Sequence, residues 1–229
     1  MRWFADRIGL KAVSVHRKQN REEALRLYRE AFAKGTENPS VLKSYASLCL
    51  RMGLYDEALT VLKRLDALPI SDSDRNEAYA DYAIVLWKKG RLDHALEILR
   101  TRLNKGKNSL LYTVIGYLLI ESGDADEALR LNQEALEYDE DDPMFLDNMG
   151  QTYYRLLDNK EEAETWFRRA LERKPTAIDS NYFMACIEGA RGEKESALKR
   201  LDIASEGNIS PLNYATSERI EALRRDLSS

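Results

Sequence analysis

Apolar and polar residues follow a helical rhythm along this chain, and the rhythm breaks at regular intervals. The stretch from Pro39 to Pro69 shows this clearly, because apolar residues recur there at spacings of three and four on both sides of Gly53. That spacing places the apolar side chains on one face of a helix. A glycine ends such a helix because it adopts the left-handed conformation without strain. The stretch therefore predicts two antiparallel helices joined by a tight turn.

The same two-helix pattern recurs six times. Each copy contains an alanine within a phrase such as NREEAL, LYDEAL or DADEAL, and successive alanines are separated by 34, 37, 33, 35 and 34 residues. A repeat of this length is typical of a solenoid of helical hairpins, in which no single hairpin can bury its own apolar face. The six alanines are Ala24, Ala58, Ala95, Ala128, Ala163 and Ala197.

The pattern resembles the tetratricopeptide repeat (TPR) family. The fifth copy, LDNMGQTYY through WFRRALERKP, matches that family's motif best, and the resemblance covers roughly Ala5 to Ala204. The chain departs from the motif in several places: the hallmark Trp appears in no copy, the closing Pro is clear only at Pro175, and residues are inserted before Asp72 and at 157–160. The resemblance implies an all-α fold: a right-handed superhelical solenoid of about six antiparallel helical hairpins.

The hairpins are expected to fill residues 1–209, and residues 210–229 are expected to form a C-terminal capping helix. Ser210 and Pro211 read as a helix cap followed by proline at the first helical position. A solenoid needs a terminal element with a polar outer face. The extra residues before Asp72 and those at 157–160 are expected to lie in loops, where insertions are tolerated.

Composition narrows the classes of partner and compartment. The net charge of −4, from 35 basic and 39 acidic residues, shows no basic stripe for nucleic acid. No segment approaches the roughly 18 apolar residues of a membrane span, so no membrane insertion is expected. Cys49 and Cys186 lie in distant repeats, too far apart for a disulfide. A cytoplasmic location is expected on these grounds.

Candidate chemistry is sparse. His16 and His94 have no Cys or His neighbour at the spacing of metal ligands. The sequence contains no phosphate-binding G-x-x-x-x-G-K-[ST] loop, and nothing arranges its Ser, His and Asp residues as a triad. We therefore expect no metal, no cofactor and no enzymatic activity.

The resemblance also implies a concave binding surface, lined by the first helices of successive hairpins. Aromatic and apolar residues at the middle lining positions are expected to form an exposed patch, and Trp and Tyr are frequent anchors at interfaces. The alternative is that Trp87 and Tyr117 pack against each other and narrow the groove. The ten candidate lining residues are Lys43, Ser47, Leu50, Ile84, Trp87, Tyr117, Ile120, Gln151, Tyr154 and Tyr182.

One subtype of the family grips the carboxyl terminus of chaperones with a set of Lys, Asn and Arg residues. Lys43 fits the first lysine of that set, but Ser47 and Asp81 stand where asparagines are needed. We therefore reject this carboxylate clamp. The function that the sequence favours is a non-catalytic scaffold or adaptor that binds a peptide or helix of a partner protein in its groove. The alternatives are a self-associating, homo-oligomeric assembly module, and a regulatory appendage of a longer enzyme or membrane protein.

Overall fold

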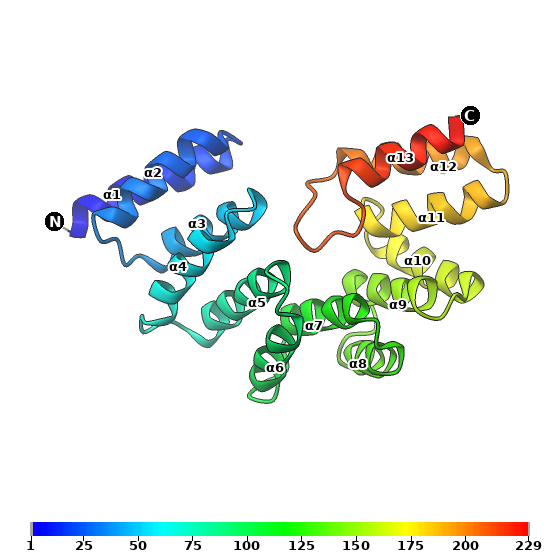
Figure 1. Ribbon diagram of the computed structural model, residues 1–229, viewed down its shortest axis with the longest axis horizontal. Coiled ribbons are helices and arrows are strands. Elements are labelled where there is room, and N and C mark those ends of the chain that lie inside the picture. The colour runs from blue at the N-terminus through cyan, green and yellow to red at the C-terminus, as the bar shows by residue number, and fades with distance from the viewer. Residues whose placement is uncertain (1, 229) are drawn as a thin grey trace. The chain divides into compact units, whose positions relative to one another are not determined.

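Thirteen α-helices and no β-strand make up residues 2–228, the part of the chain that the computed structural model describes (Figure 1). The all-α fold expected from the sequence is confirmed. The helices are α1 (Arg2–Arg17), α2 (Arg21–Ala33), α3 (Pro39–Arg51), α4 (Tyr55–Asp66), α5 (Asp72–Lys88), α6 (Leu92–Leu103), α7 (Ser109–Ser122), α8 (Ala125–Tyr138), α9 (Pro143–Arg155), α10 (Lys160–Arg173), α11 (Ile178–Ala190), α12 (Lys194–Glu206) and α13 (Ser217–Ser228).

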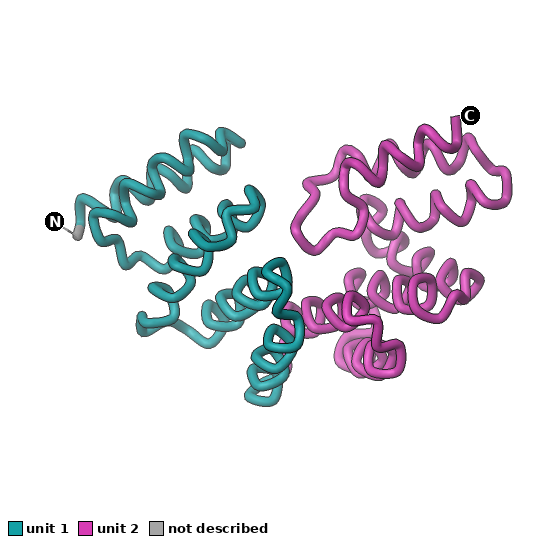
Figure 2. The backbone as a smooth tube through the Cα atoms, in the orientation of Figure 1, with its two compact units in different colours: residues 1–106 teal, residues 107–229 magenta. Residues whose placement is uncertain are grey.

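The chain divides into two compact units, Met1–Gly106 and Lys107–Ser229 (Figure 2). Unit 1 contains α1 to α6, and unit 2 contains α7 to α13. Within each unit, neighbouring helices pair as hairpins, and the second helix of a hairpin packs against the first helix of the next one. First helices also pack against each other, as α3 does against α1 and α5, and α9 against α7 and α11.

Most helices begin where the sequence supplies a capping side chain. A side-chain oxygen before the first turn accepts a hydrogen bond from an otherwise unpaired backbone N–H group. Acidic residues in the first turn add a favourable interaction with the helix dipole in several helices, as Glu22 and Glu23 do in α2. The capping residues are Asn20, Asn38, Ser71, Asn108, Asp124, Asp142 and Asn159.

The six repeat alanines are all fully buried, each near the start of a second helix. Their small side chains let the two helices of a hairpin approach closely. In the fifth hairpin, Gly150 on the first helix also allows a close approach. A Cβ atom placed there would lie 2.5 Å from the Cε1 atom of Phe167 on the second helix. The alignment of these small positions is therefore a packing requirement.

The hairpin turns use the left-handed backbone conformation that the sequence predicts at four glycines: Gly53, Gly90, Gly123 and Gly192. Two hairpins lack such a glycine and place another residue in that conformation. Gln19 has a φ of 63° and Asp158 a φ of 48°. These conformations cost about 1–2 kcal/mol for a residue that carries a Cβ atom.

One expectation about the insertions is wrong. The residues added before Asp72 do not lengthen a loop, since the connection from α4 to α5 has only five residues, Ala67 to Ser71. They lengthen α5 instead, which has 17 residues while the other first helices of hairpins 2 to 6 have 13 or 14. The extra residue near Asp158 does lie in a connection, between α9 and α10, as expected.

The start of the terminal helix is also corrected. Pro211 does not begin a helix, because α13 starts only at Ser217 and residues 207–216 form an irregular connection. The N–H group of Arg219 donates to Thr216 Oγ1 at 3.3 Å, which caps the helix there. The helix packs against α12 and α11, and Arg224 Nη1 lies 2.7 Å from Oδ1 of Asp202 on α12. Its role as a cap stays a prediction.

No helix between residues 2 and 228 combines the length and the apolar character that crossing a membrane requires.

Candidate functional site

The ten candidate lining residues all lie on first helices of hairpins, five in each unit. We call the unit 1 set, on α3 and α5, the unit-1 face: Lys43, Ser47, Leu50, Ile84 and Trp87. We call the unit 2 set, on α7, α9 and α11, the unit-2 face: Tyr117, Ile120, Gln151, Tyr154 and Tyr182.

Half of these residues are buried and the other half are only partly exposed, which corrects the expected exposed apolar patch. Five are buried, with relative exposures between 0 and 6%. The reason is that first helices pack against one another along each unit, so part of the surface assigned to the groove is helix contact. The buried residues are Leu50, Ile84, Tyr117, Ile120 and Gln151, and the half-buried ones are Lys43, Ser47, Trp87, Tyr154 and Tyr182. Partner binding by any of them stays a prediction.

Lys43 on the unit-1 face is already engaged with acidic residues of α5. Its Nζ atom forms an ion pair with Asp74 and lies 2.9 Å from Glu77 Oε2. Burial works against the charge of Lys43, but the hydrogen bonds to Asp74 and Glu77 raise its pKa overall. The lysine therefore stays charged and paired, which agrees with the rejection of the carboxylate clamp.

Asp81 is a feature of this face that sequence reasoning noted only as a mismatch. The residue lies on α5 and is half-buried. Burial, with a smaller contribution from Glu77, raises its pKa from 3.8 to about 7, while Arg51 and Lys43 oppose the rise. Asp74, Glu77 and Asp81 of α5 thus lie near two cations of α3, Lys43 and Arg51.

Trp87 lies on the last turn of α5 and is half-buried. The Nζ atom of Lys88 lies 3.7 Å from the centroid of the indole ring. A cation over an exposed indole ring contributes roughly 0.5–1 kcal/mol. The ring therefore has one side in contact with a cation, and it is positioned at the C-terminal end of the first helix.

An aromatic cluster dominates the unit-2 face. We define it as Tyr154, Tyr182, Phe183 and Tyr214. Phe183 lies at its centre, with ring centroids at 4.9 Å from Tyr154, 5.4 Å from Tyr182 and 5.0 Å from Tyr214. The ring of Phe167 on α10 stacks on that of Phe183, with 5.3 Å between the ring centroids. Aromatic pairs at such distances contribute about 0.5–1.5 kcal/mol each beyond the area that they bury.

Two members of this cluster were not in the predicted set. Phe183 belongs to a core cluster, and Tyr154 and Tyr182 pack against that cluster. Tyr214 comes from the connection before α13, where the sequence reading had placed a helix. The signal for Phe183 was present, as an aromatic residue directly after a lining position. No local signal brings Tyr214 to this face.

A buried polar network lies beside the aromatic cluster. Gln151 Nε2 donates to Asp147 Oδ2 at 2.8 Å, and Ser180 Oγ donates to the other oxygen of Asp147. Burial and the nearby Asp179 carboxyl group raise the pKa of Asp147 to about 7. Burial likewise raises the pKa of Asp179, although hydrogen bonds to Ala215, Asn213 and Tyr214 oppose the rise.

Arg155 joins the polar network to the aromatic cluster. Its Nη1 atom donates to Gln151 Oε1 at 3.1 Å, and its Nη2 atom to Glu121 Oε1 at 2.7 Å. The same guanidinium carbon lies 4.3 Å from the centroid of the Tyr214 ring. The unit-2 face thus combines aromatic surface with a cation and buried carboxyl groups.

The cysteines have no activated thiol. Cys186 is half-buried on α11, and burial raises its pKa to about 11. Burial raises the pKa of Cys49 to about 12. A thiol in such an environment is a poor nucleophile because the reactive form is the thiolate. Within the described residues, no three His, Cys, Asp or Glu side chains are grouped as metal ligands would be.

Sequence models of the tetratricopeptide repeat match three successive parts of the chain, residues 17–68, 76–101 and 113–178. The chain therefore belongs to the tetratricopeptide repeat family. The search of curated proteins finds no match. The family's fold is a general protein–protein interaction module, and its members are generally non-catalytic scaffolds.

Solved structures confirm the fold. A tetratricopeptide repeat protein from Parabacteroides merdae is 17% identical with a TM-score of 0.82, and the match covers 98% of this chain and 84% of that one. PilW, a type IV pilus biogenesis factor, is 15% identical with a TM-score of 0.68, covering 97% and 99%. TTC0263 from Thermus thermophilus is 21% identical with a TM-score of 0.61, covering 85% and 99%. At these identities the likeness concerns the fold alone.

Proposed function

We propose that this protein is a non-catalytic scaffold that binds a peptide or helix of a partner protein on the first-helix faces of its hairpins. The observation that carries the proposal is the set of half-buried aromatic side chains at lining positions, Trp87, Tyr154 and Tyr182, each on a first helix. Trp and Tyr in partly covered positions are frequent anchors of protein interfaces.

The proposal includes a cytoplasmic location, which the two free cysteines support. Free thiols persist where the compartment is reducing. The paired state of Lys43 also changes its expected role. Because Lys43 is paired with Asp74 and Glu77, its removal should free two carboxylates and strengthen the attraction to a basic partner at low salt.

The test is affinity capture with the wild-type chain and with Trp87→Ala and Tyr182→Ala, followed by mass spectrometry. A partner that uses these anchors should be retained by the wild type and bind at least about 2 kcal/mol more weakly to the variants. Ile203→Ala is the matched control, because Ile203 is an exposed apolar residue on the second helix α12. Thermal melting of each variant separates lost binding from lost folding.

The result that contradicts the proposal is equal retention of every captured protein by the wild type and both variants. A large fall in melting temperature without a specific binding defect would also count against it. That outcome would assign Trp87 to the core, since truncation of a buried Trp costs about 3–5 kcal/mol.

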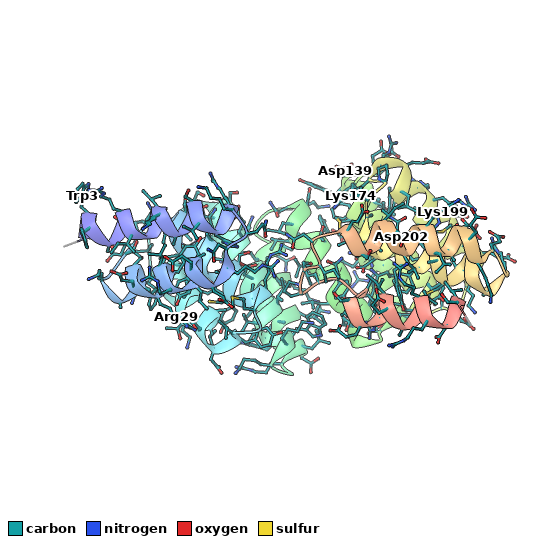
Figure 3. The ribbon with its side chains drawn as sticks, turned by 90° about the horizontal axis from the view of Figure 1, so that it is seen from above. Trp3, Arg29, Asp139, Lys174, Lys199 and Asp202 are labelled. Carbon is teal, nitrogen blue, oxygen red and sulfur yellow. The ribbon has the colours of Figure 1, made fainter. Side chains whose placement is uncertain are left out.

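One observation favours self-association as a second candidate function. Helix α1 exposes three large apolar side chains, with relative exposures of 69% for Trp3, 56% for Phe4 and 52% for Leu10. Figure 3 shows Trp3 at the outer surface near the start of α1. An exposed apolar helix face is a common dimer contact. Light scattering after size exclusion tests it, because a mass that is independent of concentration and unchanged in Trp3→Ser excludes self-association through α1.

A further inference from the structure

The connection from α12 to α13 is longer than the fold requires. We call its ten residues, Gly207 to Thr216, the strap. The other connections between hairpins have four or five residues, such as Lys174 to Ala177 between α10 and α11. Figure 1 shows the strap extending past the N-terminal end of α11 before the chain returns to begin α13. The additional residues are therefore not needed to reach the terminal helix.

The strap places an aromatic side chain on the unit-2 face. The ring of Tyr214 lies 6.0 Å from that of Tyr182, a lining residue, and 5.0 Å from that of Phe183. The guanidinium groups of Arg155 and Arg219 lie 4.3 Å and 3.7 Å from the Tyr214 centroid. Tyr214 thus occupies the kind of environment in which an aromatic anchor of a partner would bind.

Asp179 holds the backbone of the strap. Its Oδ1 atom accepts a hydrogen bond from the N–H group of Ala215 at 2.8 Å, and its Oδ2 atom accepts one from that of Tyr214 at 3.2 Å. The side-chain amide of Asn213 also donates to Oδ2 at 3.2 Å. Two of the three contacts involve main-chain groups, which every peptide offers. The grip therefore depends little on sequence, apart from the aromatic ring next to it.

The strap is anchored to the core at a few points, since Ala215 belongs to a core cluster and Ile209 and Tyr214 pack against core residues, while most of its other residues are half-buried. Ala215 is the single fully buried residue of the ten, all of which are described. A cavity of about 220 Å³ remains where the strap meets α9 and α11, lined by residues that include Asp147, Asp179 and Asn213. This cavity is partly open to solvent, and it places Asp179 beside Ser210 and Asn213 of the strap.

We propose that the strap is a built-in ligand of the unit-2 face and that a partner peptide binds there by displacing it. The peptide places its own aromatic side chain against Tyr182 and Phe183, and two of its main-chain N–H groups donate hydrogen bonds to Asp179. This inference rests on the proposed function, because it names the segment that occupies the face and the chemistry that the partner must offer. The partner is a peptide segment with an aromatic residue followed by a small one.

Intramolecular occupancy makes the face selective. A tethered segment acts at an effective concentration in the millimolar range. A free peptide with the same contacts must compete with that concentration. Its apparent affinity equals its intrinsic affinity multiplied by the fraction of molecules in which the face is open. Only a partner with additional contacts, for example on neighbouring first helices, binds well while the strap is intact.

The experiment uses the full chain and a synthetic peptide with the strap sequence, GNISPLNYAT, as the probe. Tyr214→Ala removes the aromatic anchor of the tethered strap and leaves the unit-2 face unchanged. Peptide binding, followed by the NMR signals of Tyr182 and Cys186, should be about tenfold or more tighter for this variant than for the wild type. A peptide with Ala in place of its Tyr should bind neither chain.

Two further variants keep the test decisive. Ala215→Pro removes the N–H group that donates to Asp179 Oδ1, so it should open the face as Tyr214→Ala does, even where the latter fails to fold. Leu212→Ala is the matched control within the strap, and it should bind the peptide no better than the wild type. Equal peptide binding to the wild type and both opened variants, or no binding to either opened variant, would overturn the proposal.

This outcome is separable from that of the proposed function. If the peptide binds the opened variants but no captured partner depends on Tyr182, the strap is a ligand of the face and the scaffold proposal fails there. If a partner depends on Tyr182 but the peptide does not discriminate between the chains, the scaffold proposal stands and the strap is a fixed part of the fold.

Discussion

Gly150 offers a direct test of the packing that supports the unit-2 face. A Cβ atom at this position would lie 2.5, 2.6 and 2.9 Å from three atoms of the Phe167 ring. Such distances are well below van der Waals contact, so Gly150→Ala forces the ring to move. Phe167 is fully buried and stacks on Phe183 with an interplanar angle of 6°, which leaves the ring little freedom to give way. Overpacking of this kind costs about 1–3 kcal/mol.

The same substitution has an opposing gain, because alanine favours the helix over glycine by about 0.8–1.0 kcal/mol. The net change at Gly150 is therefore a loss of roughly 0–2 kcal/mol in the free energy of unfolding. Gly189 of α11 is the matched control. A Cβ atom there would meet Leu227 Cδ2 at 2.6 Å, and the next atom only at 3.7 Å. A flexible leucine end on the terminal helix can move aside, so Gly189→Ala should be neutral or stabilising by up to about 1 kcal/mol.

Thermal melting and urea denaturation show whether Gly150→Ala is less stable than Gly189→Ala, as predicted. For a chain of this size, 1 kcal/mol shifts the melting temperature by about 2–4 °C. Near-ultraviolet circular dichroism should also change in Gly150→Ala, because Phe167 supports Phe183 and through it the aromatic cluster. The reasoning is refuted if Gly150→Ala melts at or above Gly189→Ala.

Two further predictions concern unit 1. Gln19→Gly should raise the free energy of unfolding by about 0.5–1 kcal/mol, since Gln19 has a φ of 63° where most hairpins use glycine. Lys18→Gly in the same turn should bring no gain in melting. Asp81→Asn should flatten the pH dependence of stability, because the folded state holds this proton up to about pH 7. Asp81 makes the wild type lose stability as the pH rises from about 4 through 7, and the variant should lose less over this range, by on the order of 1 kcal/mol. Urea denaturation at several pH values between 4 and 8 measures this, and the same change in stability with pH in the wild type and in Asp81→Asn would contradict the prediction.

The hairpins were predictable because each depends on local information. The apolar spacing fixes which face of a helix is covered, the repeat alanines mark the closest helix contacts, and asparagine or aspartate caps mark the helix starts. The same local logic explains one error. Ser71 caps α5 through the N–H group of Asp74 at 3.1 Å, so the inserted residues continue a helix that already has a start signal.

The lining residues were less predictable because their burial depends on neighbouring hairpins. The repeat phase correctly placed Ile84 and Tyr117 on first helices, but phase does not show how closely those helices approach one another. In the structure, α3 packs against α5 and α7 against α9, and the residues between them are covered. Burial at these positions is set by contacts between residues about one repeat apart in sequence.

The strap was missed for a different reason. Ser210 and Pro211 form a plausible helix start by local rules, and they compete with a tertiary interaction that those rules do not contain. Asp179, about 35 residues earlier, accepts hydrogen bonds from the N–H groups of Tyr214 and Ala215. This hydrogen bonding holds the backbone in an irregular path until Thr216, where the next cap is available.

The position of Asp179 also bears on whether the strap is only structural. A terminal helix could be joined to α12 by a four- or five-residue connection and an apolar contact, without a buried carboxyl group. Burial instead raises the pKa of both Asp179 and Asp147, which means that their charged forms are disfavoured where they lie. Burying a carboxyl group breaks the usual rule that charged groups lie in solvent, and it costs stability. Such departures concentrate at functional sites. Here the cost falls at the contact between the lining residues and the strap, which is where a displaceable ligand would need an acceptor for main-chain N–H groups.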